Sequence, residues 1–215
     1  MAASPAHSAR SSVEQLDAEL RAHRLSPDDF VELDLKAALD VESRIAAAPE
    51  VATVRGMFFD QLVRSAKHAN IAREERYVPF RNYPLRDYMR LVVDVARARF
   101  PQLALRDAMR RVGWDAFLTL KASVTGKVLF SFARGDAQSV LQLAPDAYKH
   151  TMSHCSVSLR VSSPGQVVLE YRDVYNFVEC YQVGIVEGAC RACGSVPQVR
   201  VRQRSAHHLD MLVRW

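Results

Sequence analysis

The residues with the clearest chemical potential are two cysteines near the C-terminus, Cys190 and Cys193, which form a C-x-x-C pair. Residues three apart share a helix face, so both thiolates could approach one zinc ion, with His207 as a further ligand. Redox dithiols of this spacing need a helix N-terminus, where the dipole lowers the thiol pKa, whereas this pair ends a predicted helix. Small buried thiols that pack the helix on a sheet are the third interpretation. Other side chains that could complete a zinc site are Cys180, His208, or His154 with Cys155.

Three tyrosines, Tyr148, Tyr171 and Tyr175, are the residues that could line a ligand pocket. Their hydroxyls could orient a small molecule among apolar neighbours. The alternative is that they are core aromatics. Asp146, close to Tyr148, is interpreted as a helix-start carboxylate rather than a general base.

The sequence lacks the motifs of the common enzyme classes. Thr125-Gly126-Lys127 is not part of a GxxxxGK[ST] phosphate loop, and neither GxSxG nor HExxH is present. We therefore predict that the chain is not an enzyme.

Cys180, Gly184 and Gly188 are spaced four apart and form a small-residue stripe on a predicted helix. Such a stripe lets another backbone approach closely, either that of the chain's own sheet or a helix of a second subunit in a homodimer. We expect Glu179, Gln182 and Arg191 on the outward side of this helix.

Composition and charge describe a folded chain with a basic balance. Its 215 residues are 49% hydrophobic and 25% charged, and 29 Lys and Arg exceed 24 Asp and Glu, a net charge of +5. Arg200, Arg202 and Arg204 alternate with Val199, Val201 and Gln203, as one polar face of a strand. That face is either solvated or an anion-binding surface, and no nucleic-acid-binding motif accompanies it.

Apolar runs are too short for a membrane span, and the first ten residues have no apolar stretch of the secretory kind. These features predict a cytoplasmic protein without a membrane partner, in which the four cysteines are thiols or ligands rather than disulfides.

The elements that must position these residues fall into two parts. Residues 1–10 are expected to be a disordered tail and 11–215 a single α+β domain, helical over about 11–150 and a sheet over about 151–215. Apolar periodicity changes from 3.6 to 2 between the two parts. The expected helices are 11–24, 26–45 (continuous or broken near Asp34), 54–67, 84–100, 103–112, 114–124 and one from 136 that Pro145 kinks or restarts, with 69–83 irregular. The expected ββαββ elements are strands 154–161 and 167–171, helix 176–193, and strands 196–204 and 207–214.

This order resembles the haem–nitric-oxide-binding (H-NOX) fold and its relatives in the 4-vinyl-reductase and TRAPP-subunit superfamily. Residues 167–175 and 183–188 resemble the second strand and the following helix of that fold. From about residue 34 onward the chain also resembles a myxobacterial paralogous family of unknown function. The segments that carry this second resemblance are 54–59, 80–85, 123–127, 145–148 and Trp215.

The H-NOX resemblance implies a pocket between the helical part and the sheet, and it provides a test for haem. The family holds the haem propionates with a Tyr-x-Ser-x-Arg run, where this chain has Tyr171, Asp173 and Tyr175. A carboxylate in place of the serine, and no arginine, should repel propionates. The iron-binding histidine of the family corresponds to Ala147 or Tyr148 here, while His150 and His154 are displaced.

The sequence therefore predicts a non-enzymatic regulatory or sensory module that binds a small ligand, a protein partner, or both, on an H-NOX-like scaffold without the haem anchors. Neither haem nor zinc is expected as a cofactor. The alternatives are a haem-binding gas sensor, in which a tyrosine could ligate ferric iron, a TRAPP-like assembly subunit, and a structural zinc protein.

Overall fold

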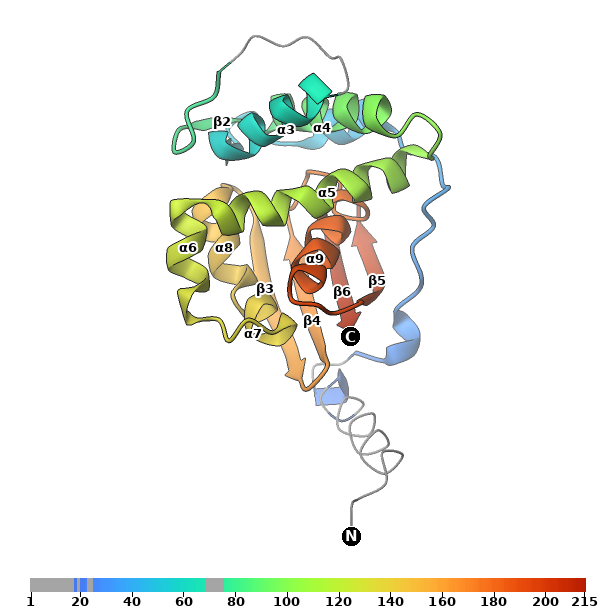
Figure 1. Cartoon of the computed structure of the whole chain (residues 1–215). Coiled ribbons are helices and arrows are strands. Elements are labelled where there is room, and N and C mark those ends of the chain that lie inside the picture. The colour runs from blue at the N-terminus through green and yellow to red at the C-terminus, as the bar shows by residue number, and fades with distance from the viewer. Residues whose placement is uncertain (1–17, 19, 23–24, 69–75) are drawn as a thin grey trace.

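The computed structural model describes residue 18 and residues 20–22, 25–68 and 76–215. A layer of helices lies above one long helix, and beneath it stands an antiparallel sheet with a helix across its front (Figure 1). The predicted tail over 1–10, most of the predicted helix over 11–24 and part of the irregular stretch over 69–83 lie outside the described residues.

The upper layer consists of α2 (Val41–Ala47), α3 (Gly56–His68) and α4 (Leu85–Arg99). Tyr88, Met89 and Val92 of α4 are buried, as its apolar period predicts. Two short strands that the sequence did not indicate, β1 (Thr53–Arg55) and β2 (Asn82–Pro84), pair antiparallel at the starts of α3 and α4. Strands of three residues are too short for alternation to be recognised.

The long central helix is α5 (Leu105–Ala122), which corrects the prediction of two helices divided at Gly113. Gly113 lies inside the helix, where an added Cβ would overlap the carbonyl oxygen of Tyr181. The glycine therefore serves a close approach between two backbones and does not end the helix.

Short helices connect α5 to the sheet. They are α6 (Val124–Leu129), the 3-10 turn η2 (Phe130–Phe132), α7 (Ala137–Gln142) and α8 (Ala144–Thr151). Ser123 and Asp136 cap α6 and α7, since their side chains accept bonds from the Gly126 and Ser139 amides. Pro145 lies in the first turn of α8, so it restarts the helix as expected.

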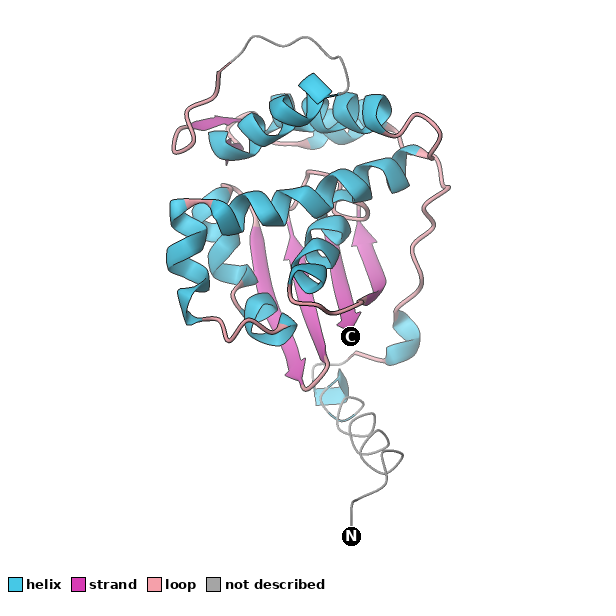
Figure 2. Ribbon diagram, in the orientation of Figure 1, coloured by secondary structure: helices cyan, strands magenta, loops and turns pink. Residues whose placement is uncertain are grey.

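The sheet confirms the predicted ββαββ order. The strands β3 (Ser156–Ser163), β4 (Gln166–Arg172), β5 (Gln198–Ser205) and β6 (His208–Arg214) lie in the order β3-β4-β6-β5, antiparallel throughout (Figure 2). Helix α9 (Tyr181–Ala192) crosses the front face, where Val167, Leu169 and Tyr171 are fully buried. It starts five residues later than predicted.

The N-terminal segment crosses behind the sheet, and only the last part of the predicted helix over 26–45 forms an α-helix, within α2. Before α2 the segment contains the 3-10 turn η1 (Pro27–Asp29), capped by Ser26. Leu20, Leu25 and Phe30 pack on Val161, Val168 and Leu212 of the back face. Val31 then bridges to Val201 on the sheet edge. Burial of Phe30 and this edge pairing hold the segment extended.

No helix in the part of the chain that the structure describes combines the length and the apolar character needed to cross a bilayer.

Candidate functional site

A small cavity lies where the upper helical layer, α5, α8 and α9 meet. Its volume is about 40 Å³. The walls are mostly apolar and include Phe58 of α3, Ala116 and Leu120 of α5, Ala147 of α8 and Ile185 of α9. About 10–15 Å³ is enough for one water, so the cavity has room for a few light atoms.

Tyr148, Asn176 and Gln182 are among the polar residues that line this cavity. The Tyr148 hydroxyl donates to the Gln182 side-chain oxygen. Gln182 Nε2 and Asn176 Oδ1 are buried and have no hydrogen-bond partner among the described residues. A buried donor and a buried acceptor without partners are costly, which is why most such groups bind water or a ligand.

A second tyrosine pair closes the cavity on the side of the upper layer. The hydroxyls of Tyr88 and Tyr181 are hydrogen-bonded at 2.5 Å, and both residues line the cavity. Burial raises the pKa of Tyr88 and of Tyr148 well above the ordinary phenol value, because it disfavours the charged form. Both phenols are therefore neutral hydrogen-bonding groups at physiological pH.

Helices α5 and α9 are locked together beside the cavity. Glu187 of α9 accepts from Arg110 at 2.7 and 2.5 Å and from the Trp114 indole at 2.9 Å. The Glu187 side chain is only 3% exposed. These contacts fix the two walls that α5 and α9 contribute.

The three tyrosines predicted to line a pocket are separated by the structure. Tyr148 lines the cavity. Tyr171 is fully buried one layer deeper, with its ring edge on to that of Tyr148 at 5.7 Å between centroids. Tyr175 lies outside and stacks on His207 at 4.7 Å.

The cavity amides were missed because Gln182 was expected to look outward, together with Glu179. Both are buried, at 0% and 1% exposure. The residues before α9 form turns, and the side of α9 that would otherwise be open is covered by other elements. One signal in the sequence could have indicated that Gln182 is buried: it lies between Cys180 and Gly184, two residues of the small-residue stripe.

The predicted zinc ligands are not gathered by the structure. Cys190 is buried on α9, and Cys193 follows the end of that helix, half-buried. His207, by contrast, stacks on Tyr175, a residue that precedes α9 in the chain. Within the described residues, one group of three His, Cys, Asp or Glu residues has its ligand atoms within 4.8 Å of one another. It consists of Glu170, His208 and Asp210 and lies on the back face of the sheet.

The glycine stripe predicted as an interface is covered by α5 of the same chain. A Cβ on Gly184 would overlap the carbonyl oxygen of Arg110, and one on Gly188 would overlap that of Trp114. The close backbone approach that the stripe predicted therefore occurs within one chain, between two helices. Homodimer formation stays a prediction without this surface to support it.

The positions that the H-NOX resemblance assigns to haem binding are also dispersed. None of the described residues around the cavity is a histidine, and His150 and His154 are exposed. Asp173, at the position of the clamp serine, has a side chain 63% exposed.

The sequence profile of one family, described as Protein of unknown function (DUF2378), matches residues 48–215. No curated protein matches the chain.

Solved structures of similar fold are H-NOX domains. A mutant H-NOX protein from S. oneidensis in the Fe(II) state aligns with a TM-score of 0.57 at 16% identity, over 74% of this chain and 95% of that one. A mutant H-NOX protein from K. algicida in the Fe(II) unliganded state gives 0.55 at 10% identity, over 74% and 95%. The SO2144 H-NOX domain from Shewanella oneidensis in the Fe(II)CO state gives 0.55 at 18%, over 74% and 97%. These likenesses establish the H-NOX fold of the chain.

Proposed function

Because this chain belongs to the DUF2378 family, whose description assigns no activity, we propose its function from the cavity. The protein is a non-enzymatic regulatory or sensory module that binds a small ligand between α5, α8 and α9. The observation that carries this proposal is a mostly apolar cavity two of whose lining residues, Gln182 and Asn176, each carry a buried amide atom without a hydrogen-bond partner among the described residues. One donor and one acceptor in apolar surroundings are what orient a small polar molecule.

The cavity supports a ligand of a few heavy atoms and does not fit haem. Ligand pockets of the size that a drug-sized molecule or a porphyrin needs are roughly 300–1,000 Å³, whereas this cavity has about 40 Å³. The Tyr148 hydroxyl, which would have to ligate iron, is already engaged by Gln182. Neither Asp173 nor Tyr175 lines the cavity, so no described group there replaces the propionate clamp.

Ligand binding would act through the helices that form the cavity walls. A molecule between Ala147 of α8 and Ile185 of α9 contacts both the sheet part and α5. A ligand shifts a conformational equilibrium only by its difference in affinity for the two states. The output of the module is thus a change in how α5 packs on α9, read by a protein partner.

Native mass spectrometry, absorption spectroscopy and methyl NMR of freshly purified protein test the proposal together. We expect a bound small molecule, or binding of xenon as a general probe of the cavity, seen as shifted methyl resonances of Ile185 and Leu120. The variant Ala147→Val fills the cavity and abolishes the effect. The control Ala108→Val changes another buried alanine, on α5, that does not line the cavity.

Two results would overturn this function. A stoichiometric Soret band would identify a haem protein. Absence of both a bound molecule and any xenon shift at the cavity methyls would leave the cavity without a binding role.

The other assignments of the sequence remain proposals beside this one. We place the protein in the cytoplasm and among myxobacterial paralogues, and we propose that it uses no zinc. Loss of stability on Cys190→Ser together with zinc in elemental analysis would contradict the last point.

A further inference from the structure

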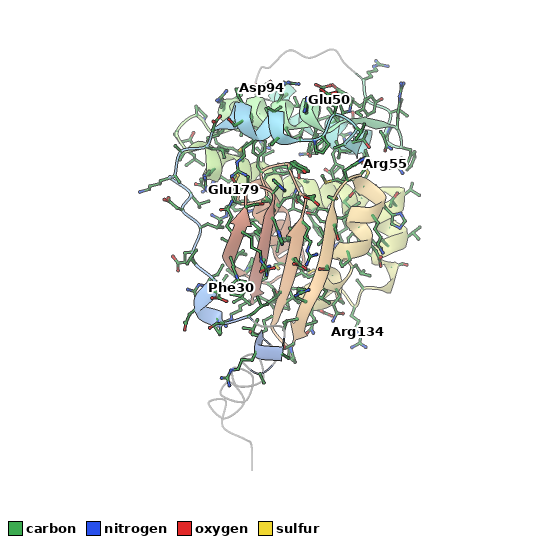
Figure 3. The ribbon with its side chains drawn as sticks, turned by 180° about the vertical axis from the view of Figure 1, so that it is seen from behind. Phe30, Glu50, Arg55, Asp94, Arg134 and Glu179 are labelled. Carbon is green, nitrogen blue, oxygen red and sulfur yellow. The ribbon has the colours of Figure 1, made fainter. Side chains whose placement is uncertain are left out.

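The back face of the sheet, opposite α9, is divided into an apolar and a polar half. The apolar half carries Val161, Val168 and Leu212 under the N-terminal segment. No helix of the described part covers the other half when the molecule is seen from behind, with Phe30 at the border (Figure 3). We call this second area the polar half; it comprises Ser158, Arg160, Glu170, Arg172, Arg202, Arg204, His208 and Asp210.

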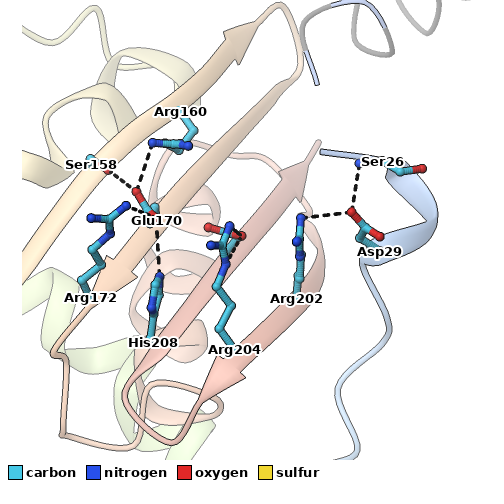
Figure 4. Close-up of polar contacts among 10 residues, drawn as sticks. Ser26, Asp29, Ser158, Arg160, Glu170, Arg172, Arg202, Arg204 and His208 are labelled. Atoms are coloured by element: carbon cyan, nitrogen blue, oxygen red, sulfur yellow. Dashed lines mark hydrogen bonds and ion pairs between the residues drawn. The ribbon is translucent and has the colours of Figure 1, made fainter. Parts of the chain in front are cut away.

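The centre of the polar half is Glu170, whose side chain is 3% exposed. Arg172 lies 2.8 Å and Arg160 3.4 Å from its carboxylate oxygens. His208 at 3.4 Å and Ser158 at 3.2 Å complete the ring (Figure 4). The arginine contacts hold the pKa of Glu170 below its ordinary value, against the effect of burial.

A second buried carboxylate holds the next arginine. Both Arg204 Nε and Arg204 NH2 donate to Asp210 Oδ2, at 3.0 and 2.8 Å, and the Asp210 side chain is 1% exposed. Beside it, Arg202 binds Asp29 of the N-terminal segment at 3.0 Å. The carboxylates thus lie beneath the arginines, which remain 31–53% exposed in Arg202, Arg204 and Arg172.

The charge of this face favours an anion over a metal ion. In the polar half, four arginines (Arg160, Arg172, Arg202 and Arg204) face two buried carboxylates, Glu170 and Asp210. With Asp29 on Arg202, this leaves a surplus of one positive charge. A divalent cation at Glu170, His208 and Asp210 would add charge beside three guanidinium groups that already neutralise the two carboxylates.

We infer that the polar half is a docking surface for an acidic polypeptide segment of a protein partner. The chain itself shows how such a segment binds this face: Asp29 pairs with Arg202 while the adjacent Phe30 enters the apolar half. A partner segment would place its carboxylates on Arg172 and Arg160, and on Arg202 in place of Asp29. The exposed guanidinium edges, held in position by the buried carboxylates, present the fork that carboxylates bind.

Nucleic acid fits this surface less well. The polar half contains no Phe, Tyr or Trp side chain on which a base could stack. Glu170 and Asp210 lie at its centre and would repel a continuous row of phosphates. Separate side-chain carboxylates can instead reach individual arginines. This inference concerns the opposite side of the sheet from the cavity and does not depend on the ligand proposed there.

Fluorescence anisotropy with two labelled probes tests the inference on the full chain. The probes are a short peptide of alternating Glu and Ser and an oligothymidylate of equal charge, titrated at low ionic strength. We expect the peptide to bind and the oligonucleotide to bind more weakly. The double variant Arg172→Gln/Arg202→Gln should weaken peptide binding about tenfold, because two exposed ion pairs are lost.

Arg64→Gln/Arg90→Gln is the matched control, since it removes the same charge away from the sheet. These arginines are 65% and 54% exposed and form ion pairs within α3 and α4. Its effect should be less than about twofold. Asp29→Asn frees Arg202 and should tighten peptide binding about threefold, a gain that misfolding cannot produce. Equal losses in both double variants, no peptide binding, or tighter binding of the oligonucleotide would each overturn the inference.

Discussion

The contact between Arg110 and Glu187 makes a quantitative prediction about how α5 is held on α9. Arg110→Met leaves a carboxylate that is 3% exposed with only the Trp114 indole as donor. Breaking one side of a buried ion pair costs about 3–5 kcal/mol. Because Arg110 is itself 23% exposed, we expect the lower end, about 3 kcal/mol of unfolding free energy.

The double variant Arg110→Met/Glu187→Met removes the uncompensated charge as well. Its expected cost is about 1 kcal/mol, mainly for the Trp114 N–H that loses its acceptor. Urea unfolding followed by tryptophan fluorescence measures both values, provided that the slope with denaturant is unchanged. A single variant that costs less than about 1 kcal/mol, or a double variant as unstable as the single one, would refute this reasoning.

Three further outcomes follow from burial around the same helices. Gly184→Ala should lose about 2 kcal/mol or more in urea unfolding, because its Cβ would overlap the α5 backbone; an unchanged midpoint would contradict that packing. Burial raises the pKa of Cys155 from 9.0 to about 11 and that of Cys190 to about 12. Both should therefore react with a thiol reagent at pH 8 at least about a hundredfold more slowly than a free thiol, and the fastest phase should vanish in Cys193→Ser. The folded state binds these protons more tightly, so its stability is complete below about pH 9 and falls as pH rises through 11–12; a flat alkaline melting profile would argue against this.

The sequence was most informative in the hairpin, where apolar residues recur at every second position. Val167, Leu169 and Tyr171 alternate with Val168 and Glu170, so strand, hairpin and order could be predicted. Gly113 was misinterpreted because a glycine that ends a helix and one that admits a neighbouring backbone have the same local pattern. Only the tertiary position of Tyr181 distinguishes the two.

The site residues depended on contacts between distant segments. Tyr148, a residue that the sequence could suggest, lines the cavity together with Gln182 and Asn176, which are brought there only by the way α8 and α9 meet. Behind the sheet, the alternation of Arg200, Arg202 and Arg204 indicated a polar face. The register between β4 and β6 then pairs Glu170 with Asp210, which no local pattern reveals.

The N-terminal segment has a practical consequence for anyone who shortens this protein. The family match begins at residue 48, so an expression clone cut to that boundary would lack Leu25, Phe30 and the Val31 bridge. Val168 and Leu212, each at most 1% exposed in the intact chain, would then meet water beside a bare β5 edge. Such a fragment should self-associate or precipitate. Its poor solubility would reflect an uncovered apolar surface rather than a failure of the remaining residues to fold.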